Sequence, residues 1–268
     1  MCGRYSLTTS PDVLAALFRL TTVPAYALRY NIAPTQAAPI VRIHSETGSR
    51  QLDMLRWGLV PSWAKQPDIG SRLINARSET AAEKPAFRHA FKRQRCLVPA
   101  DAFYEWKKLP TGKQPYVLRL RDGQPFAFAG LWEQWRDSAQ PHEPPLETFT
   151  ILTTTANSVV VEVHDRMPVI LNANDFDCWL DPSVKDAARL QSLLVPLASE
   201  AMVAYPVSRR VNSPAHDDPS CLEPLDASQA EGAPPPSSAA SLFDSSQQSK
   251  PHPNVDNSGS ANRQNLFD

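Results

Sequence analysis

The chain lacks several features that would place it in a specialised class. No apolar run in its 268 residues approaches the ~20 residues that a membrane-spanning helix needs. The opening segment, MCGRYSLTTS, has no apolar core of the kind found in secretory signals. No internal repeat recurs every 20–50 residues, which argues against a solenoid. These absences predict a soluble protein of the cytoplasm.

Cysteine is scarce and widely spaced. The four cysteines are Cys2, Cys96, Cys178 and Cys221, and no two form a CxxC motif. Zinc sites and redox motifs depend on such spacing, and disulfide frameworks are typical of small secreted domains. The sequence therefore predicts free thiols, with neither a metal nor a cofactor.

Charge and composition divide the chain into two parts. The net charge is −1, but from His216 onward eight acidic residues stand against two basic ones, which leaves 20 acids and 25 bases before it. Beyond residue 225, Pro, Ser, Gln and Asn dominate and apolar residues are few. Such a segment buries too little apolar surface to offset its ordering entropy. We therefore expect a domain over residues 2–225 and a disordered acidic tail over residues 226–268.

The domain is predicted to be α+β, because short strand-like runs with short links favour antiparallel pairing. The expected strands are Ile40–Ile43, Leu52–Trp57, Cys96–Trp106, Tyr116–Leu120, Phe126–Trp132 and Phe149–Thr155. A helix is expected to begin after Ser10, with Pro11 in its first turn. Two further helices are expected at Ser78–Arg93 and Ala156–His164.

Cys2 is the first candidate for chemistry. A small second residue permits methionine aminopeptidase to remove Met1, which leaves Cys2 with an α-amine and a thiol on adjacent carbons. Their ordinary pKa values, about 7.7–8.0 and about 8.5, make both partly available as nucleophiles at neutral pH. An aldehyde condenses with the amine, and the thiol then closes a five-membered thiazolidine. Taken alone, Cys2 could equally be an ordinary small residue.

A series of motifs surrounds this chemistry in a fixed order. They are MCGRY, RYNIAPTQ (Arg29–Gln36), RWGLVPSWAK (Arg56–Lys65), INARSET (Ile74–Thr80), RCLVPADAFYEWK (Arg95–Lys107), FAGLWE (Phe128–Glu133) and VHDRMPVIL (Val163–Leu171). This pattern resembles the SRAP family, the SOS response-associated peptidases that sense abasic sites in DNA. The resemblance runs over about residues 2–225.

The resemblance implies a fold, an activity and a set of roles. The fold would be a single compact domain of curved, mainly antiparallel β-sheets with flanking helices around a positively charged cleft. The protein would bind single-stranded DNA, form a covalent thiazolidine crosslink to the abasic site and shield it. Cys2 would be the nucleophile, Asn75 would orient the amine and the sugar, Glu105 would act in acid–base chemistry, and His164 would assist proton transfer.

These roles also agree with the residue types. Opening an abasic deoxyribose moves a proton from the hydroxyl to the ring oxygen, a task for a carboxyl or an imidazole. Glu105 stands in the apolar and aromatic run Ala102–Trp106, and an amide such as Asn75 can hold a sugar hydroxyl. Each also has an ordinary interpretation: a solvent-facing strand carboxylate for Glu105, a turn residue for Asn75, and a histidine at a helix C-terminus for His164.

The expected DNA contacts are basic and flat side chains inside the same motifs. Arginine forks suit phosphate oxygens, which favours Arg4, Arg77 and Arg166. The resemblance favours Pro34 and Trp63 as the surface for bases beside the lesion. Core packing is the better interpretation of Trp57. The run Pro214-Ala215-His216 replaces a more basic, amide-rich stretch of the family, which weakens the expectation of DNA contacts there.

Two other functions remain open at this stage. An N-terminal-nucleophile cysteine amidohydrolase or peptidase would also use an exposed Cys2, but it would need no DNA surface. A non-covalent module for single-stranded DNA would not need Cys2. The resemblance favours a bacterial, nucleoid-associated enzyme that crosslinks itself to abasic sites, with lyase- or hydrolase-like chemistry and with Met1 removed by an aminopeptidase or by the protein itself. We further expect a monomer, with Leu266 and Phe267 as a possible clamp-binding peptide of the replication machinery.

Overall fold

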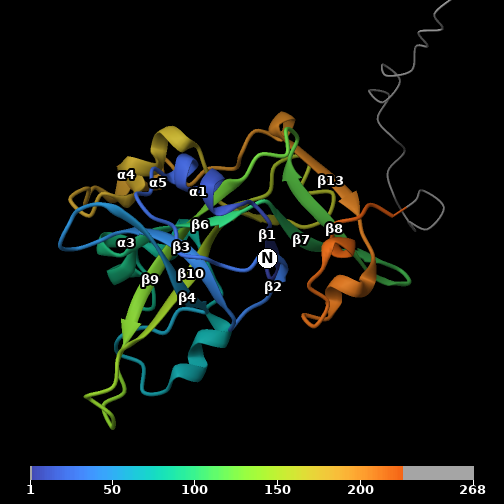
Figure 1. Ribbon diagram of the computed structural model, residues 1–268. Coiled ribbons are helices and arrows are strands. Elements are labelled where there is room, and N and C mark those ends of the chain that lie inside the picture. The colour runs from blue at the N-terminus through green and yellow to red at the C-terminus, as the bar shows by residue number, and fades with distance from the viewer. Residues whose placement is uncertain (1, 226–268) are drawn as a thin grey trace, which may run out of the picture. The chain divides into compact units, whose positions relative to one another are not determined.

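A computed structural model describes residues 2–225, and these residues form two β-sheets with short helices around them (Figure 1). The predicted tail, including Leu266 and Phe267, lies outside the described residues. The predicted fold class, a single compact α+β domain with mainly antiparallel sheets, is confirmed.

The eight-stranded sheet contains a closed ring of five strands. Its path runs β11-β10-β4-β3-β6-β9-β12, β5 pairs with β10, and an additional pairing of β10 with β9 closes the ring. The ring strands are β3 (Ala37–Ile43), β4 (Arg50–Trp57), β6 (Arg95–Ala100), β9 (Phe126–Trp135) and β10 (Leu146–Thr155). The others are β5 (Asn75–Arg77), β11 (Arg166–Pro168) and β12 (Ile170–Leu171). A closed ring leaves no exposed edge along its paired strands.

The pairings around the ring are unequal. β6 and β9 are in register over six positions, from Arg95–Leu131 to Ala100–Phe126. β3 and β6 share a single registered pair, Val41 with Leu97. β4 and β10 share only two registered pairs, Arg56 with Thr148 and Trp57 with Phe149. The ring therefore has two thinly paired seams, β3–β6 and β4–β10.

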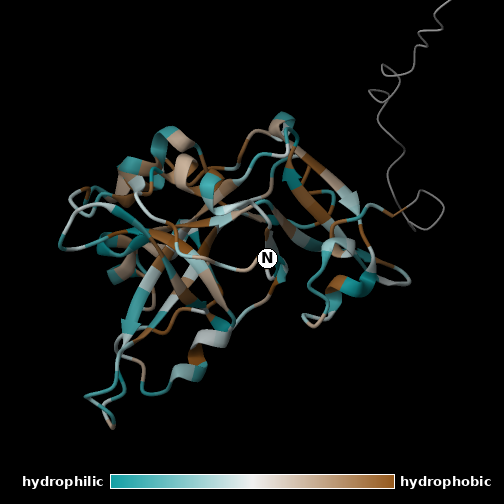
Figure 2. Ribbon diagram, viewed as in Figure 1, coloured by the Kyte–Doolittle hydropathy of each residue, from teal (hydrophilic) through white to brown (hydrophobic). Residues whose placement is uncertain are grey.

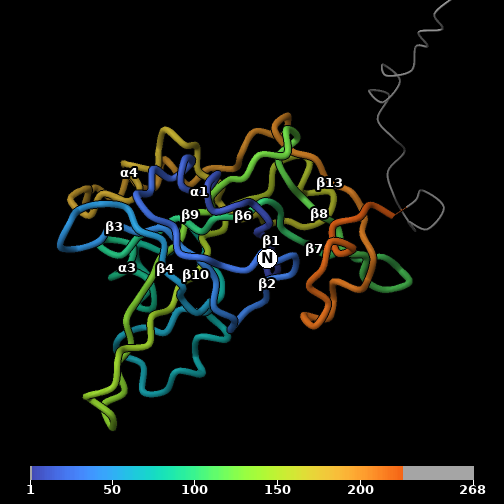
Figure 3. Tube along the Cα trace, viewed as in Figure 1, coloured from blue at the N-terminus to red at the C-terminus, as the bar shows by residue number. Residues whose placement is uncertain are grey.

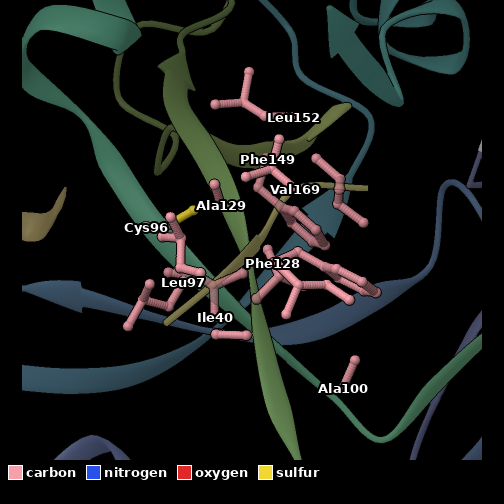
Figure 4. Packing of buried hydrophobic residues seen from close by; sticks show 14 of the residues in the cluster. Ile40, Cys96, Leu97, Ala100, Phe128, Ala129, Phe149, Leu152 and Val169 are labelled. Carbon is pink, nitrogen blue, oxygen red and sulfur yellow. The ribbon is translucent and has the colours of Figure 1, made fainter. Parts of the chain in front are cut away.

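Aromatic and aliphatic side chains fill the core of this sheet. Ile40, Phe128 and Phe149, from three different strands, converge in Figure 4, and each is 0% exposed. Gly130 permits close packing on β9, because a Cβ there would lie 2.8 Å from Cys96 Sγ and 2.9 Å from Val98 Cγ2. Figure 2 shows hydrophobic residues along the strands of both sheets. This core supplies most of the apolar burial that stabilises the fold.

The smaller sheet holds the N-terminal segment. Its order is β13-β8-β7-β1-β2, with β1 (Tyr5–Leu7) between β2 (Arg29–Ile32) and β7 (Ala102–Leu109). The remaining strands are β8 (Gly112–Leu120) and β13 (Met202–Pro206). Figure 3 follows the chain from its first residues into β1. Because β1 has a strand on each side, the segment that begins with Cys2 is fixed in place by backbone hydrogen bonds.

The helices are short. They are α1 (Pro11–Phe18), α2 (Ser78–Ala81), α3 (Arg88–Arg93), α4 (Phe176–Leu180) and α5 (Ala187–Gln191). Five 3-10 turns are η1 (Pro67–Arg72), η2 (Ala173–Asp175), η3 (Ser199–Ala201), η4 (Arg209–Asn212) and η5 (Pro219–Cys221). The predicted start of α1 is confirmed, although the Ser10 side chain makes no capping hydrogen bond. None of the described helices is long and apolar enough to cross a membrane.

Two of the predicted helices are wrong. Ser78–Arg93 is divided into α2 and α3 around Pro85, because proline lacks an N–H and restricts the residue before it. Ala156–His164 forms turns instead of a helix. There the Asn157 Oδ1 accepts hydrogen bonds from the amides of Val159 and Val160, as a helix cap would, but the backbone bonds that follow mix four-residue and three-residue spacings, so no regular helix forms.

One predicted strand is also wrong in its extent. The run Cys96–Trp106 divides at Asp101 into β6 and β7, which belong to different sheets. The Asp101 carboxylate accepts hydrogen bonds from the backbone and hydroxyl groups of Thr8 and Thr9. Asp101 therefore turns the chain at the junction of the two sheets, directly beside β1. The other predicted strands lie within β3, β4, β8, β9 and β10.

Candidate active site

Cys2 is fully buried immediately before β1. Its side chain is 0% exposed, and Sγ lies 3.8 Å from the carbonyl oxygen of Arg4. Burial raises the pKa of the Cys2 thiol well above its ordinary value, and the negative charge of Glu105 raises it further. In the folded chain, burial therefore favours the protonated thiol more strongly than the ordinary cysteine pKa suggests.

Asn75 fixes the backbone of Cys2. It begins β5, which pairs in parallel with β10, and its Nδ2 donates a hydrogen bond of 2.7 Å to the carbonyl oxygen of Cys2. Its Oδ1 is buried and has no partner within the described part of the chain. An acceptor left open beside the nucleophile is suited to an incoming hydroxyl or amine.

Glu105 brings a buried carboxyl to the same place. It lies on β7, the central strand of the smaller sheet, and is 2% exposed. The solvent-facing interpretation of this residue is therefore wrong. Its charge raises the pKa of the Cys2 thiol, so the two groups are close enough to interact electrostatically. The structure thus brings three predicted site residues together, with Asn75 on the Cys2 carbonyl and Glu105 near the Cys2 thiol.

His164 lies in the turn before β11. Its side chain is 29% exposed, Nδ1 is 2.9 Å from an Asp165 carboxylate oxygen, and the Arg166 amide donates to Nδ1 over 3.0 Å. The turn orients an imidazole that can exchange a proton, which is the property its predicted role requires.

Two predicted phosphate ligands flank the end of β10. Thr153 is in register with Arg77 on one side and with Pro168 of β11 on the other. Arg77 is exposed, whereas Arg166 is held by the Glu79 carboxylate through two bonds, of 2.7 and 2.9 Å. The bond from Arg166 lowers the pKa of Glu79. Of the two guanidinium groups, only that of Arg77 can receive a phosphate without displacing a carboxylate.

Arg4 connects the nucleophile to a more distant loop. Its Nη2 donates to the carbonyl oxygen of Asn212 over 3.3 Å, and its Nε is buried with no partner in the described residues. Asn212 also accepts a 2.7 Å hydrogen bond from the indole of Trp106 through Oδ1. One residue of η4 therefore links the neighbours of Cys2 and of Glu105.

Pro34 stands in a strained turn after β2. Gln36 donates to the carbonyl oxygen of Ala33, and Thr35 has a φ of 71°, a conformation that a β-branched residue rarely adopts. Backbone bonds between Thr35 and Trp57, and between Trp57 and Gln36, hold the turn. Pro34 is half-buried, so the strain presents a rigid, flat residue at the surface.

The two predicted tryptophans have different environments. Trp57 is 0% exposed, and its indole donates to the carbonyl oxygen of Ile74 over 2.8 Å, which confirms core packing. Trp63 is 59% exposed. Gly58 permits the intervening bend with a φ of 125°, and a Cβ there would lie 2.6 Å from the Gly70 oxygen. Trp63 therefore offers an open ring for stacking.

The sequence interpretation missed Asn31 and Asn212. Asn31 is fully buried, and its Nδ2 lies within 3.1 Å of the carbonyl oxygens of Val211, Ser213 and His216, so it anchors the loop that contains Asn212. The only signal was an amide inside the RYNIAPTQ motif at a position that reads as a strand. Within residues 2–225, no group of three or more His, Cys, Asp or Glu side chains could hold a metal ion.

Comparison with known proteins identifies the family. A family model described as "SOS response associated peptidase (SRAP)" matches residues 1–214. The chain belongs to the SRAP family. It is 44% identical over 227 residues to "Abasic site processing protein YoqW" of Bacillus subtilis, an alignment that covers 83% of this chain and 99% of the relative.

More distant SRAP relatives match as well. "Abasic site processing protein HMCES" of Gallus gallus is 32% identical over 230 residues, covering 75% of this chain and 67% of the relative. A crystal structure of a Bacteroides thetaiotaomicron protein superposes with a TM-score of 0.72 at 27% identity, covering 84% of this chain and all of that one. The SRAP fold therefore accounts for the arrangement of the two sheets.

Proposed function

We propose that this protein captures abasic sites in single-stranded DNA as a covalent thiazolidine on Cys2, and so shields the lesion. The observation that carries the proposal is the position of Cys2, whose side chain is buried and whose backbone carbonyl accepts a hydrogen bond from Asn75. The negative charge of Glu105 lies close enough to raise the pKa of the Cys2 thiol. The relatives are named abasic site processing proteins, and these names support the same substrate.

The reaction needs two bonds to the sugar aldehyde. After Met1 is removed, the α-amine of Cys2 attacks C1′ of the ring-opened sugar, and water leaves to give the iminium. The thiol sulfur then bonds to C1′, the electron pair of the C=N bond returns to nitrogen, and the thiol proton passes to a base. A thiol held protonated by burial suits this order, because the amine attacks first and the thiol needs to ionise only at ring closure.

Each side chain of the site has a proposed task. Glu105 moves the proton that opens the sugar ring and accepts the thiol proton, while His164 assists the transfer. Asn75 holds Cys2 and offers its open Oδ1 to the sugar. Arg4 and Arg77 bind phosphates, Arg166 supports them through Glu79, and Pro34 and Trp63 contact the flanking bases.

The deciding experiment is intact mass spectrometry of the purified protein before and after single-stranded abasic DNA is added. We expect loss of Met1, followed by an adduct equal to the sum of protein and oligonucleotide minus one water. The adduct should survive boiling without borohydride, because a closed thiazolidine is stable and a Schiff base is not.

Two variants separate the alternatives. Cys2→Ser forms no thiazolidine and should give no heat-stable adduct, whereas Cys178→Ser changes a half-buried cysteine outside the site and should react as the unaltered protein does. An adduct that requires borohydride would overturn the thiazolidine. DNA binding that is complete without any adduct would favour the non-covalent module, and acyl-enzyme formation with an amide substrate would favour the amidohydrolase.

A further inference from the structure

The hairpin that follows Glu105 carries an unusual pair of charges. Lys108 of β7 and Lys113 of β8 are direct cross-strand partners, and both are exposed. Like charges directly opposite one another in a sheet are destabilising, so their placement calls for a compensating anion. Among the described residues, neither lysine forms an ion pair with an acidic side chain.

A second basic segment lies on the same face of the smaller sheet. Side chains alternate along a strand, so Trp106 and Lys108 of β7 point to one face. Trp106 donates to Asn212 at the end of η4, and η4 contacts β8. Arg209 and Arg210 of η4 are exposed, and only Arg210 has an acidic partner, Asp218 at 3.4 Å, among the described residues. Figure 1 shows this orange segment beside the green hairpin of β7 and β8.

A chain of contacts joins these cations to the nucleophile. Arg4, two residues after Cys2, donates to the carbonyl oxygen of Asn212, whose side chain accepts from Trp106. Asn31 fixes the loop from behind by bonding to the carbonyls of Val211, Ser213 and His216. These contacts hold the 209–216 segment at a defined position relative to Cys2, on the face of the smaller sheet that Trp106 shares and that lies opposite Glu105.

We propose that Lys108, Lys113, Arg209 and Arg210, the hairpin basic surface, bind the phosphates of the DNA strand that leaves the lesion site. The inference rests on the proposed function for the position of the lesion, and it adds a second contact region to the DNA partner. Polyanion backbones suit such a surface, because phosphates lie at regular spacing and ammonium groups bind them without sequence preference. The surface lengthens the DNA footprint beyond the reacting sugar and its immediate neighbours.

The test measures non-covalent binding to DNA of different lengths. The lesion is a tetrahydrofuran abasic analogue, which has no aldehyde and cannot crosslink. Short strands of about five nucleotides span one small binding site, and longer strands extend on the 5′ side, the 3′ side or both. Binding is followed by fluorescence anisotropy at several salt concentrations, for the unaltered protein, for Lys108→Gln/Lys113→Gln, and for Lys92→Gln/Lys185→Gln, which removes the same charge from exposed lysines elsewhere.

The hairpin variant should bind one class of long strand about 3- to 10-fold more weakly and flatten its log–log salt slope by up to about 1.4, because each phosphate contact on single strands contributes about 0.7. Its affinity for short strands should not change, and the control variant should match the unaltered protein on every strand. Equal losses on short and long strands, or equal losses in both variants, would overturn the proposal, since they would report net charge alone.

The outcome can be separated from that of the proposed function. The hairpin variant should still crosslink a short abasic strand at the unaltered rate. If neither the unaltered protein nor any variant crosslinks, but the hairpin variant still binds long strands more weakly, the hairpin basic surface is supported and the thiazolidine chemistry is disproved. If crosslinking is normal and no strand length distinguishes the variants, the chemistry stands and the surface falls.

Discussion

The strand ring of the larger sheet and the smaller sheet treat their buried polar groups differently. In the ring, the buried Glu133 carboxylate lies 3.1 Å from His89 Nδ1, and Thr150 Oγ1 is the one buried side-chain polar atom of the described ring strands without a partner. In and beside the smaller sheet, five such atoms have no partner among the described residues: Arg4 Nε, Tyr5 Oη, Ser6 Oγ, Asn31 Oδ1 and Tyr116 Oη. Three of these five residues are consecutive and follow Cys2 closely.

This contrast teaches where stability and reactivity lie in the molecule. Unpartnered buried groups each cost free energy, and such costs are typical of sites that are prepared for a ligand or a reaction. The ring, with its aromatic core, supplies the stability that offsets them. The comparison predicts that substitutions in the two sheets have opposite signatures, and three of them test it.

The largest expected effect is on the reaction. Glu105→Gln keeps the shape of the side chain but removes its charge, and should slow crosslinking about 10²–10⁴-fold, the usual range for loss of a general acid–base group. Binding of DNA with the tetrahydrofuran analogue should be unchanged, because a glutamine side chain fills the same space. Crosslinking is timed on denaturing gels at saturating DNA.

The matched control for Glu105 is Glu133→Gln, which alters a buried carboxylate of the ring. It should leave the crosslinking rate of the folded protein as it was, since its partners are structural. If both variants slow crosslinking equally, the special position of Glu105 is disproved and the contrast between the sheets fails with it.

Much of this arrangement could be predicted from the sequence, because the evidence was local. Cys2, Asn75 and Glu105 were each recognisable inside a short motif, and strands with alternating or continuous apolar residues appeared where expected. The failures were non-local. Nothing in the neighbouring residues identifies Asp101 as the junction between β6 and β7. The helix break at Pro85 was missed because the charged residues around it have helical spacing, which favoured one continuous helix.

The site also contains relations that no pattern of single residues conveys. The ion pair between Arg166 and Glu79 joins positions 87 residues apart. The hydrogen bonds from Asn31 to the 211–216 loop join positions about 180 residues apart. The sequence showed Arg166 as a basic residue within the VHDRMPVIL motif. It did not show that the guanidinium group of Arg166 is already bound to the Glu79 carboxylate. Such pairings follow from the closure of the two sheets and become visible only with the fold.

The second substitution probes the stabilising region. Phe128→Ala removes a fully buried ring from β9 that contacts Tyr5, Phe103 and Phe126, and should lower the free energy of unfolding by about 3–5 kcal/mol. Denaturant titration measures the loss, and the molecules that remain folded should still crosslink. Because Tyr5 and Phe103 belong to the smaller sheet, a loss below about 1 kcal/mol would mean that aromatic packing of the strand ring against that sheet is not a main source of stability.

The smallest effect has the opposite sign. Tyr116→Phe removes a buried hydroxyl without a described partner from the smaller sheet, and should raise the free energy of unfolding by about 1 kcal/mol. The same denaturant titration reports it. A decrease would show that the hydroxyl has a hydrogen-bond partner in solution, and the smaller sheet would then have one unpartnered buried atom fewer than the comparison assumes.

The single registered pair between β3 and β6 has a consequence for how the molecule opens. A ring cannot unfold one strand at a time from an edge, because it has none, so we expect its first opening at a thinly paired seam, of which β3–β6 has the fewest registered pairs. Parting at Val41 and Leu97 would turn the closed ring into an open sheet while β6–β9 and β9–β10 stay joined. The half that stays joined includes β10, on which both β5 and β11 depend, so Asn75 and Arg166 would keep their support during a partial opening. The protein could thus fluctuate at one seam without dismantling its reactive centre.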